Sequence, residues 1–269
     1  MKYLIVNADD FGFTPDVNEG IVAAHRQGIL TATTLMANGP AFDHAVRLAH
    51  ENPSLDVGCH LVLVGGEGYP ATIPELVRAL AQRKIQVYEE LSGQVRRILS
   101  AGIQPTHLDT HKHTHLLPPV LNAVAQISSE FGIPWVRRPF DFPMSANGIP
   151  WRNRLVSRGM DVLRPRFRQV LTRHGCRTTD HFAGFQMTGS YGAQELATLI
   201  RKLPEGTTEF MCHPGFCGES LRAAKTRLKE SRQSELEALI SPQVRSAVAE
   251  ANVAVVTYRD LSPLPSRAA

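Results

Sequence analysis

Carboxylate and imidazole side chains in this sequence stand where apolar runs end. Asp9 and Asp10 follow the first apolar run, and His60 lies at the end of another. His213 follows the run over residues 207–212. In a parallel α/β barrel the carboxyl ends of all strands open on one face, and that face holds the active site. We therefore expect these segments, which are remote in sequence, to converge on a single site.

The segment 106–115 is rich in ionisable side chains. They occupy every second position, as His107, Asp109, His111, His113 and His115. An extended chain would turn all of them to one side, whereas a helical turn starting near Thr110 would place His111 and His115 on one face. Neutral imidazoles fill a core poorly and charged ones repel each other. We therefore interpret the segment as a site of metal binding or acid–base chemistry.

The adjacent carboxylates of Asp9 and Asp10 carry a second signal. Two such groups repel each other unless a cation or a donor keeps one of them ionised. Helix capping or an Asx turn is one interpretation of the pair. The other is a division of labour, because neighbouring side chains diverge in an extended chain. One carboxylate would then bind a metal while its neighbour takes a proton from water.

An aspartate with two histidines is a known set of metal ligands that leaves positions open for water and substrate. A metal held there would lower the pKa of its water and polarise a carbonyl. His213, which Pro214 and Gly215 follow, could protonate a leaving amine or be a turn residue. Cys59 and Cys212 each precede a candidate histidine. Strand alternation points them toward the helices, so we do not count them as ligands.

Strand and helix patterns alternate along the chain. We predict strands over residues 3–6, 31–36, 55–61, 105–109, 135–138, 181–185, 207–212 and 253–257. We predict helices over residues 14–28, 40–49, 73–82, 87–101, 118–131, 151–172, 193–203 and 231–250. Such alternation requires a parallel sheet, closed as a barrel or open and doubly wound. No G-x-G-x-x-G follows the first strand, which weakens the open, dinucleotide-binding form.

We therefore predict the α/β class, as a single-domain, irregular TIM-like (β/α) barrel over residues 1–262. A basic insertion is expected at about 139–177, and a frayed tail over 263–269. The 269 residues, 43% hydrophobic and 20% charged, suit one such domain. The segment 137–177 is rich in arginine, which fits either a solvated face or attraction to an anionic substrate or membrane surface.

Composition also bounds the setting of the protein. No apolar run approaches the ~20 residues that a transmembrane helix needs. The first apolar stretch is too short for a signal peptide, so we expect a cytoplasmic protein. Cys59, Cys176, Cys212 and Cys217 form no C-x-x-C pair and are expected to be buried thiols. No nucleic-acid partner is expected, because no recognised motif accompanies the net charge of +4.

A series of sequence blocks recurs in an order and spacing that are specific. They are Leu4–Gly12, Gly28–Thr34, Asp43–Val46, Gly58–Leu63, Thr106–His111 with His113 and His115, and Met211–Pro214. With them, most of the chain resembles the YdjC-like family of carbohydrate deacetylases, including its chitooligosaccharide (ChbG) and hopanoid-associated (HpnK) branches. The basic stretch Arg137–Arg177 aligns poorly with the chitooligosaccharide enzymes. A glycolipid head group is therefore an alternative substrate to a chitooligosaccharide.

The resemblance implies a role for each candidate residue. The metal ligands would be Asp10, His60 and His111, with Asp9 as general base and His213 as general acid. The substrate end of the pocket would be lined by His113 and His115, and we count Arg138 as substrate-binding too. The family is associated with magnesium, while two imidazole ligands argue for zinc or another transition metal. A homodimer is a further expectation from the resemblance.

The predicted reaction is hydrolysis of the N-acetyl group of an amino sugar to acetate and free amine. One alternative is another metal-dependent barrel hydrolase, acting on a phosphoester or a cyclic amide. A phosphatase would usually need two metals and more carboxylates. A non-catalytic sugar-binding protein is a second alternative, although two Trp and five Tyr are few aromatics for that role. A metal-free glycosidase is disfavoured, because Asp9 and Asp10 are too close in sequence to flank a bond.

Overall fold

The computed structural model describes residues 1–142 and 151–261. The predicted tail over 263–269 and the part of the predicted basic insertion over 143–150 lie outside the described residues. Within the described ranges, no helix combines the length and apolarity needed to cross a membrane.

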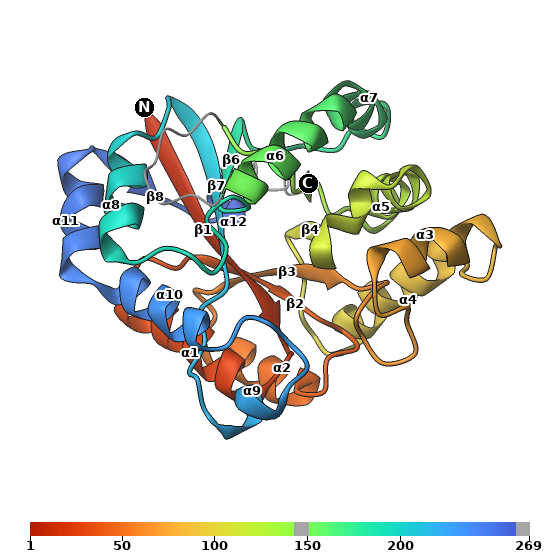
Figure 1. Cartoon of the computed structure of the whole chain (residues 1–269), viewed down its shortest axis with the longest axis horizontal. Coiled ribbons are helices and arrows are strands. Elements are labelled where there is room, and N and C mark those ends of the chain that lie inside the picture. Colours follow the sequence, from red (N-terminus) through yellow and green to blue (C-terminus); the bar gives the residue numbers. More distant parts are fainter. Residues whose placement is uncertain (143–150, 262–269) are drawn as a thin grey trace, which may run out of the picture.

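The sheet is built around β1 (Lys2–Phe11), which runs through the middle of the molecule (Figure 1). One edge of β1 pairs in parallel with β7 (Gly206–Cys212). The other edge is shared: β8 (Val253–Val255) pairs with its first residues, and β2 (Ala32–Leu35) pairs with its last. The longest strand therefore reaches from one end of the barrel to the other.

The remaining strands extend the sheet to both sides. From β2 the order runs through β3 (Asp56–Leu61) and β4 (His107–Thr110) to β5 (Trp135–Val136), and β6 (His181–Ala183) lies beyond β7. Between β5 and β6 only isolated parallel bridges are found in the described chain, Trp135 with Arg177 and Asp141 with Phe182. All pairings are parallel, so the prediction of an irregular TIM-like barrel is confirmed.

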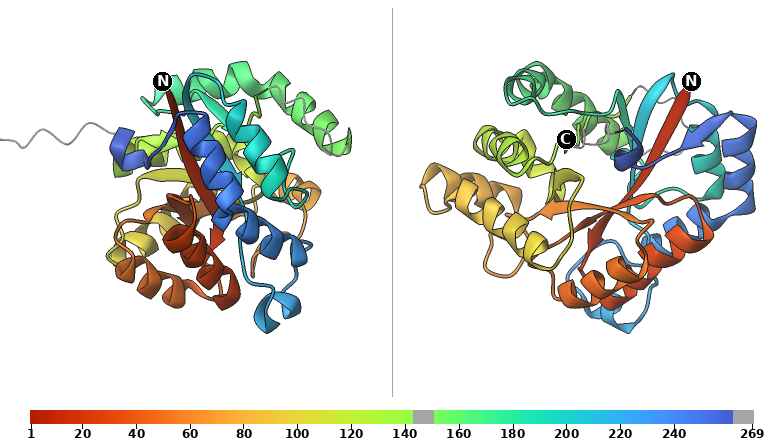
Figure 2. Two further views of the ribbon diagram at one scale, coloured as in Figure 1. Left: turned by 90° about the vertical axis from the view of Figure 1, so that its left-hand side faces the viewer. Right: turned by 180° about the vertical axis from the view of Figure 1, so that it is seen from behind.

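The helices lie outside the sheet (Figures 1 and 2). Along the chain they are α1 (Pro15–Gln27), α2 (Phe42–Glu51), α3 (Ile73–Ala81), α4 (Val87–Ser100), α5 (Pro118–Phe131), α6 (Trp151–Met160), α7 (Arg164–Arg173), α8 (Ala193–Arg201), α9 (Glu219–Ala223), α10 (Glu230–Ile240), α11 (Pro242–Glu250) and α12 (Tyr258–Leu261). Two 3-10 segments, η1 (His111–Leu116) and η2 (Asp161–Leu163), join them. Local signals set several ends: the Thr14 hydroxyl accepts from Val17 N–H to begin α1, and Gly132 in the left-handed conformation ends α5.

Strand alternation separates two environments. Leu4, Val6 and Ala8 of β1 pack in the large core between sheet and helices. The alternate residues face the barrel interior, where Ile5 belongs to a small apolar cluster with Ala32, Trp135 and Tyr258. Farther along β1 the interior turns polar, first at Asn7, whose Oδ1 accepts from His107 Nε2 at 3.0 Å, and then at Asp9. Polar groups therefore gather at the carboxyl end of the barrel, as the sequence predicts.

The predicted elements agree with the structure except at short or irregular segments. The helix over 118–131 is found at those bounds, while β1 extends well beyond the predicted 3–6. The basic helix over 151–172 is interrupted by η2. After β4 the chain forms neither a continued strand nor an α-helix, because Lys112 and His113 take positive φ angles of 52° and 53° within η1. The short helices α9 and α12 were not predicted.

Gly184 offers a test of how closely β6 packs beside β7. Its φ is 124°, and a Cβ atom there would lie 2.2 Å from the carbonyl oxygen of Met211. Gly184→Ala should therefore lower the free energy of unfolding by about 1–3 kcal/mol, measured by urea denaturation. Gly93→Ala in α4 is the matched control, since nothing lies within 4 Å of its Cβ position. It should raise stability by about 0.5–1 kcal/mol; equal stabilities for the two variants would contradict this packing.

Candidate active site

A break in the β1 ladder sets the two adjacent carboxylates. The pairing register with β2 shifts between Ala8 and Phe11, and Asp10 has a φ of 69°. In a regular strand, Asp9 and Asp10 would point to opposite faces. The irregularity lets both side chains, each only 4% exposed, reach polar partners at the barrel mouth. Aspartate tolerates the left-handed region better than most residues, which makes it suited to this position.

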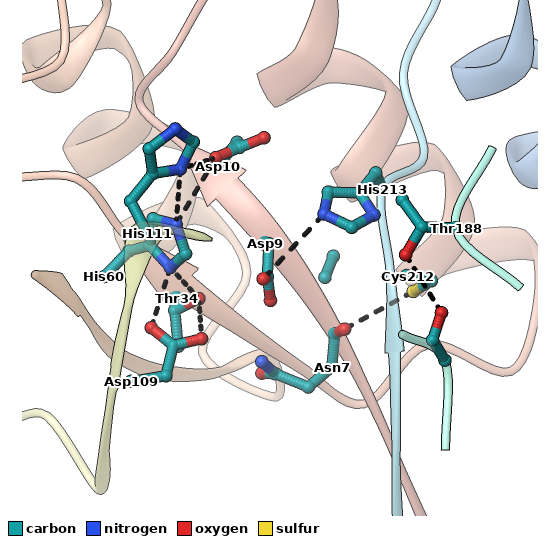
Figure 3. A network of polar contacts seen from close by, with 12 residues as sticks. Asn7, Asp9, Asp10, Thr34, His60, Asp109, His111, Thr188, Cys212 and His213 are labelled. Carbon is teal, nitrogen blue, oxygen red and sulfur yellow. Dashed lines mark hydrogen bonds and ion pairs between the residues drawn. The ribbon is translucent and has the colours of Figure 1, made fainter. Parts of the chain in front are cut away.

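Asp10, His60 and His111 meet at one point (Figure 3). Asp10 Oδ1 lies 3.4 Å from His60 Nε2 and 3.2 Å from His111 Nδ1. The two ring nitrogens are themselves 3.2 Å apart. His60 is the second-last residue of β3, and His111 directly follows β4. The two adjacent strands therefore position the two imidazoles. The site opens at His111, whose side chain is 24% exposed, whereas His60 is buried.

Asp109 fixes the orientation of His60. Its Oδ1 lies 2.7 Å from His60 Nδ1, and its Oδ2 accepts from the Thr34 hydroxyl at 3.1 Å. Burial opposes the charge of Asp109, but Arg137 and His60 hold its pKa far below the ordinary value. A carboxylate can only accept, so His60 Nδ1 carries the proton. His60 Nε2 is thereby directed at Asp10, the arrangement by which an outer carboxylate orients a metal-ligating histidine.

The guanidinium of Arg137 joins three carboxylates in the barrel interior. It donates to both oxygens of Asp9, at 2.8 and 2.7 Å, in a bidentate pair. Its other contacts are Asp109 Oδ2 at 2.5 Å and Glu209 Oε1 at 2.6 Å. Arg137 is 1% exposed, so water competes little for these bonds. Asp9 is thus held in one orientation, with lone pairs left for a further hydrogen bond.

His213 lies on the other side of Asp9. Its Nε2 is 3.9 Å from Asp9 Oδ2, and its backbone N–H donates to Glu235 Oε2 at 2.6 Å. Burial lowers the pKa of His213 to about 4, although the carboxylates of Asp9 and Asp10 oppose this. The ring is therefore neutral at neutral pH in the resting protein. It faces the same space as Asp9 and Asp10.

Helix α10 holds two parts of this site from outside the sheet. Arg232 donates to Asp10 Oδ2, so only Oδ1 of that carboxylate faces the two histidines. Three residues later, Glu235 accepts from the backbone of His213 and of Gly189, the latter at 2.9 Å, and from the Tyr191 hydroxyl at 3.1 Å. One turn of α10 therefore sets both a candidate metal ligand and the loop that carries the candidate acid.

The profile of the family described as YdjC-like protein matches residues 3–250. The chain belongs to the YdjC-like family. Curated relatives with the same extent include a carbohydrate deacetylase of Brevibacillus brevis, 32% identical over 96% of this chain and 99% of that protein. A chitooligosaccharide deacetylase of Klebsiella pneumoniae is 32% identical over 97% of this chain and 99% of its own.

A solved structure supports the same fold for this YdjC-like chain. It is a protein of Enterococcus faecalis described as a cellobiose-phosphate cleavage protein, 26% identical, with a TM-score of 0.75. The match covers 97% of this chain and 99% of that one. An Agrobacterium tumefaciens protein shares the fold at a TM-score of 0.52 and 11% identity.

The trio of Asp10, His60 and His111 fits a divalent metal ion. Their ligand atoms all lie within 4.8 Å of one another. Asp10 Oδ1 is buried and has no hydrogen-bond partner among the described residues, which is costly for a carboxylate oxygen unless a cation meets it. Burial disfavours the ionised form, but Arg232, His111 and His60 hold the pKa of Asp10 well below its ordinary value. An ionised oxygen facing two ring nitrogens is a ligand set for a transition metal or zinc.

The other predicted site residues lie in different surroundings. His113 is buried, and the centre of its ring lies 5.6 Å from that of Phe185. Burial holds the pKa of His113 well below the ordinary value. His115 is fully buried with both ring nitrogens engaged, by the Thr110 hydroxyl and the backbone oxygen of Arg137. It offers no free nitrogen to a substrate. The alternating cluster over 107–115 is thus divided among several environments.

Arg138 makes none of the contacts with the site carboxylates that its neighbour Arg137 makes. Its guanidinium donates to the backbone oxygen of Asp180. Burial is the main cause that lowers the pKa of Arg138, and the charges of Arg164 and Arg168 lower it further. Arg137, which the sequence analysis did not single out, is the arginine that faces inward. Trp135, two residues earlier, already faces the interior, so strand alternation was the signal that could have found Arg137. No comparable signal marks Arg232 or Glu235, because both lie on a helix remote in sequence from the site.

Metal uptake should release a proton from His60. Burial disfavours the charged ring, but the carboxylates of Asp109 and Asp10 raise the pKa of His60 to about 10. His60 is therefore protonated in the metal-free protein at pH 7.5 and must lose a proton to become a ligand. We expect about one proton released per metal bound, and affinity falling about tenfold per pH unit as pH drops below 10.

Calorimetric titration with Zn²⁺ in HEPES and in Tris at pH 7.5 measures this release. The heats should differ by about one ionisation enthalpy of the buffers. His174→Gln, which alters an exposed histidine, is the control and should leave the proton count unchanged. Equal heats in the two buffers would show that His60 is already neutral in the metal-free protein.

Proposed function

We propose that this chain is a metal-dependent carbohydrate deacetylase that hydrolyses the N-acetyl group of an amino sugar to acetate and a free amine. The observation that supports the proposal most is that a set of possible metal ligands lies next to a carboxylate and a histidine that could act as base and acid. A three-ligand set of Asp10, His60 and His111 lies beside Asp9, a carboxylate that Arg137 fixes and that faces His213. Such an arrangement combines metal binding with a base and an acid, as amide hydrolysis requires.

Asp10, His60 and His111 would hold the ion. When bound, a divalent ion supplies Lewis-acid activation of the acetamide carbonyl and of the attacking water. Two imidazole nitrogens and one carboxylate oxygen favour zinc or another transition metal over magnesium, although magnesium is the ion associated with the family by resemblance. Asp109 and Arg232 keep the ligands oriented through the contacts described above.

Asp9 would act as the general base. Each of its oxygens already accepts one bond from Arg137, so each retains a lone pair for the proton of the attacking water. The bidentate pair prevents the carboxylate from rotating before the reaction. Arg137 is thus a positioning residue for Asp9.

His213 would complete the reaction as proton donor to the departing amine. The ring is neutral in the resting protein, so it must first gain a proton. His213 Nε2 lies 3.9 Å from Asp9 Oδ2, so the proton that Asp9 accepts would reach the ring through one bridging water and pass from there to the amine nitrogen. This order matches a buried histidine that is a weak base at rest and an acid only during turnover.

The names of the relatives support the proposed substrate class. Their names specify a carbohydrate or a chitooligosaccharide, and the proposed substrate here is an N-acetylated amino sugar, as a chitooligosaccharide or as a glycolipid head group. His113, buried against Phe182 and Phe185, is proposed to line the acetyl end of the pocket. A small acetyl methyl group suits such an aromatic wall.

A single metal is favoured over the two-metal site of many phosphoesterases. The second group of clustered ligand atoms in the described chain is Asp9, His60 and Asp109. There the Arg137 guanidinium already binds both carboxylates and would repel a second cation. This arrangement argues against the phosphatase alternative.

Metal analysis of the purified protein, combined with product release, tests the proposal. The panel should hold N-acetylglucosamine, chitooligosaccharides of increasing length, N-acetylglucosaminyl lipids, sugar phosphates and cyclic amides. We expect acetate from at least one N-acetylated sugar and loss of activity after chelation. Phosphate release without acetate would establish a phosphoesterase instead.

Two substitutions should separate the base from the metal ligands. Asp9→Asn removes the proton acceptor and should lower the rate of acetate release by about 10²–10⁴-fold while metal content stays near that of the unaltered chain. His111→Ala removes a ligand and should lose both metal and activity. Metal content is measured by elemental analysis after dialysis.

The matched control is Asp43→Asn on α2, an exposed carboxylate that should alter neither quantity. Near-normal turnover by Asp9→Asn would refute Asp9 as the base. Retained stoichiometric metal in His111→Ala would remove that residue from the ligand set.

A further inference from the structure

We propose that α6, η2 and α7 together form a surface that binds an anionic lipid bilayer. This α6–α7 surface covers residues 151–173 and lies at the rim of the molecule, outside the sheet (Figures 1 and 2). The proposal does not depend on the proposed function, because it concerns an exposed surface and not the barrel mouth.

Apolar side chains are exposed here to an unusual degree. Trp151 is 68% exposed, Leu155 63% and Val162 80%. Trp151 and Leu155, four residues apart, lie on one side of α6, and Val162 follows them in η2. Val156 and Leu163 are exposed beside them, so this surface has five of the eight large hydrophobic residues that are exposed in the described chain. Single exposed apolar residues are common, but a cluster of this kind marks a contact surface.

The charge of the same surface is strongly positive. Residues 151–173 contain a single acidic residue, Asp161, which pairs with Arg164. Their arginines are Arg152, Arg154, Arg158, Arg164, Arg166, Arg168 and Arg173. The Arg152 guanidinium lies 5.5 Å from the centre of the exposed Trp151 ring. Arginine with exposed tryptophan, leucine and valine is the composition of helices that lie in the interface of an anionic membrane.

An anionic bilayer matches both the exposed apolar side chains and the positive charge, whereas a second copy of the chain or a nucleic acid matches only one of these features. Across a two-fold contact between copies of this chain, the arginines would face one another and repel. A nucleic acid would meet the arginines but would leave Trp151, Leu155 and Val162 in water. An anionic bilayer offers phosphates to the guanidiniums and acyl chains to the apolar stripe.

The α6–α7 surface is fixed close to the candidate active site. Asn153 of α6 donates to the backbone oxygen of Gln186 at 3.0 Å, and the Gln186 side-chain amide donates to the Ser157 hydroxyl at the same distance. The adjacent Phe185 ring contacts His113. Attachment through α6 would therefore hold the barrel mouth near the lipid surface.

Sedimentation of the full chain with vesicles tests the proposal. Phosphatidylcholine vesicles are compared with vesicles containing one third phosphatidylglycerol, in low salt. We expect at least tenfold tighter partitioning onto the anionic vesicles, weakened as salt is raised to about 0.5 M because surface charge is screened. Equal partitioning onto both kinds of vesicle would overturn the proposal.

Tryptophan fluorescence locates the contact. The chain has two tryptophans, and Trp135 is buried within the barrel. A blue shift on adding anionic vesicles should therefore come from Trp151 and should vanish in Trp151→Phe while sedimentation persists. Binding without such a shift would place the contact elsewhere and refute the α6–α7 surface.

Paired substitutions separate the apolar and charged contributions. Leu155→Ser with Val162→Ser, and Arg158→Glu with Arg166→Glu, should each reduce vesicle binding at least tenfold while the circular dichroism spectrum is unchanged. Val77→Ser with Arg78→Glu, exposed on α3, is the matched control and should bind as the unaltered chain does. Unchanged vesicle binding in both α6–α7 variants would refute the proposal. It would also be refuted if the variants abolished concentration-dependent self-association of the chain and left vesicle binding unchanged.

Discussion

The charge on Arg137 is the constraint on which the rest of the site depends. One guanidinium inside the barrel binds Asp9, Asp109 and Glu209, carboxylates delivered by three different strands. Without it, carboxylates buried close together could not remain ionised. Removing one partner from such a buried group typically costs about 3–5 kcal/mol. The same guanidinium therefore orients Asp9 and holds the pKa of Asp109 far below its ordinary value.

The balance of charge at the barrel mouth leaves room for a cation. In the described chain, Asp9, Asp10, Asp109 and Glu209 form ion pairs with two arginines, Arg137 and Arg232. The remaining negative charge draws a proton to His60 in the metal-free protein, which is the meaning of its raised pKa. A divalent ion and that proton compete for the same place. A preference of this site for a metal would thus depend on the carboxylates and arginines around Asp10, His60 and His111 as much as on those three residues.

Sequence reasoning predicted the architecture and the convergence of the site, for identifiable physical reasons. Barrel strands in this chain are apolar runs bounded by proline, glycine or capping residues, and polar residues at their carboxyl ends must share one face. Details within segments were less accessible. His111 and His115 are equivalent in the alternating pattern, yet positive φ angles at Lys112 and His113 send one toward Asp10 and the other into the backbone.

Tertiary contacts determined what the pattern could not. Arg137 and Arg138 are adjacent arginines, and only the pairing of the short strand β5 decides which one enters the barrel. Arg232 and Glu235 belong to a helix whose sequence carries no sign of the residues it touches. Likewise, Asp9 and Asp10 suggested a division of labour, but the ladder irregularity that permits it is invisible in the residues themselves.

The contact between α10 and β1 also has a consequence for the order in which parts of the protein can fold. Asp10 is synthesised 222 positions before its partner Arg232. The loop bearing His213 likewise waits for Glu235. A growing chain can therefore pair β1 with β2 and β3 before α10 is available to hold Asp10 and the loop of His213 in place.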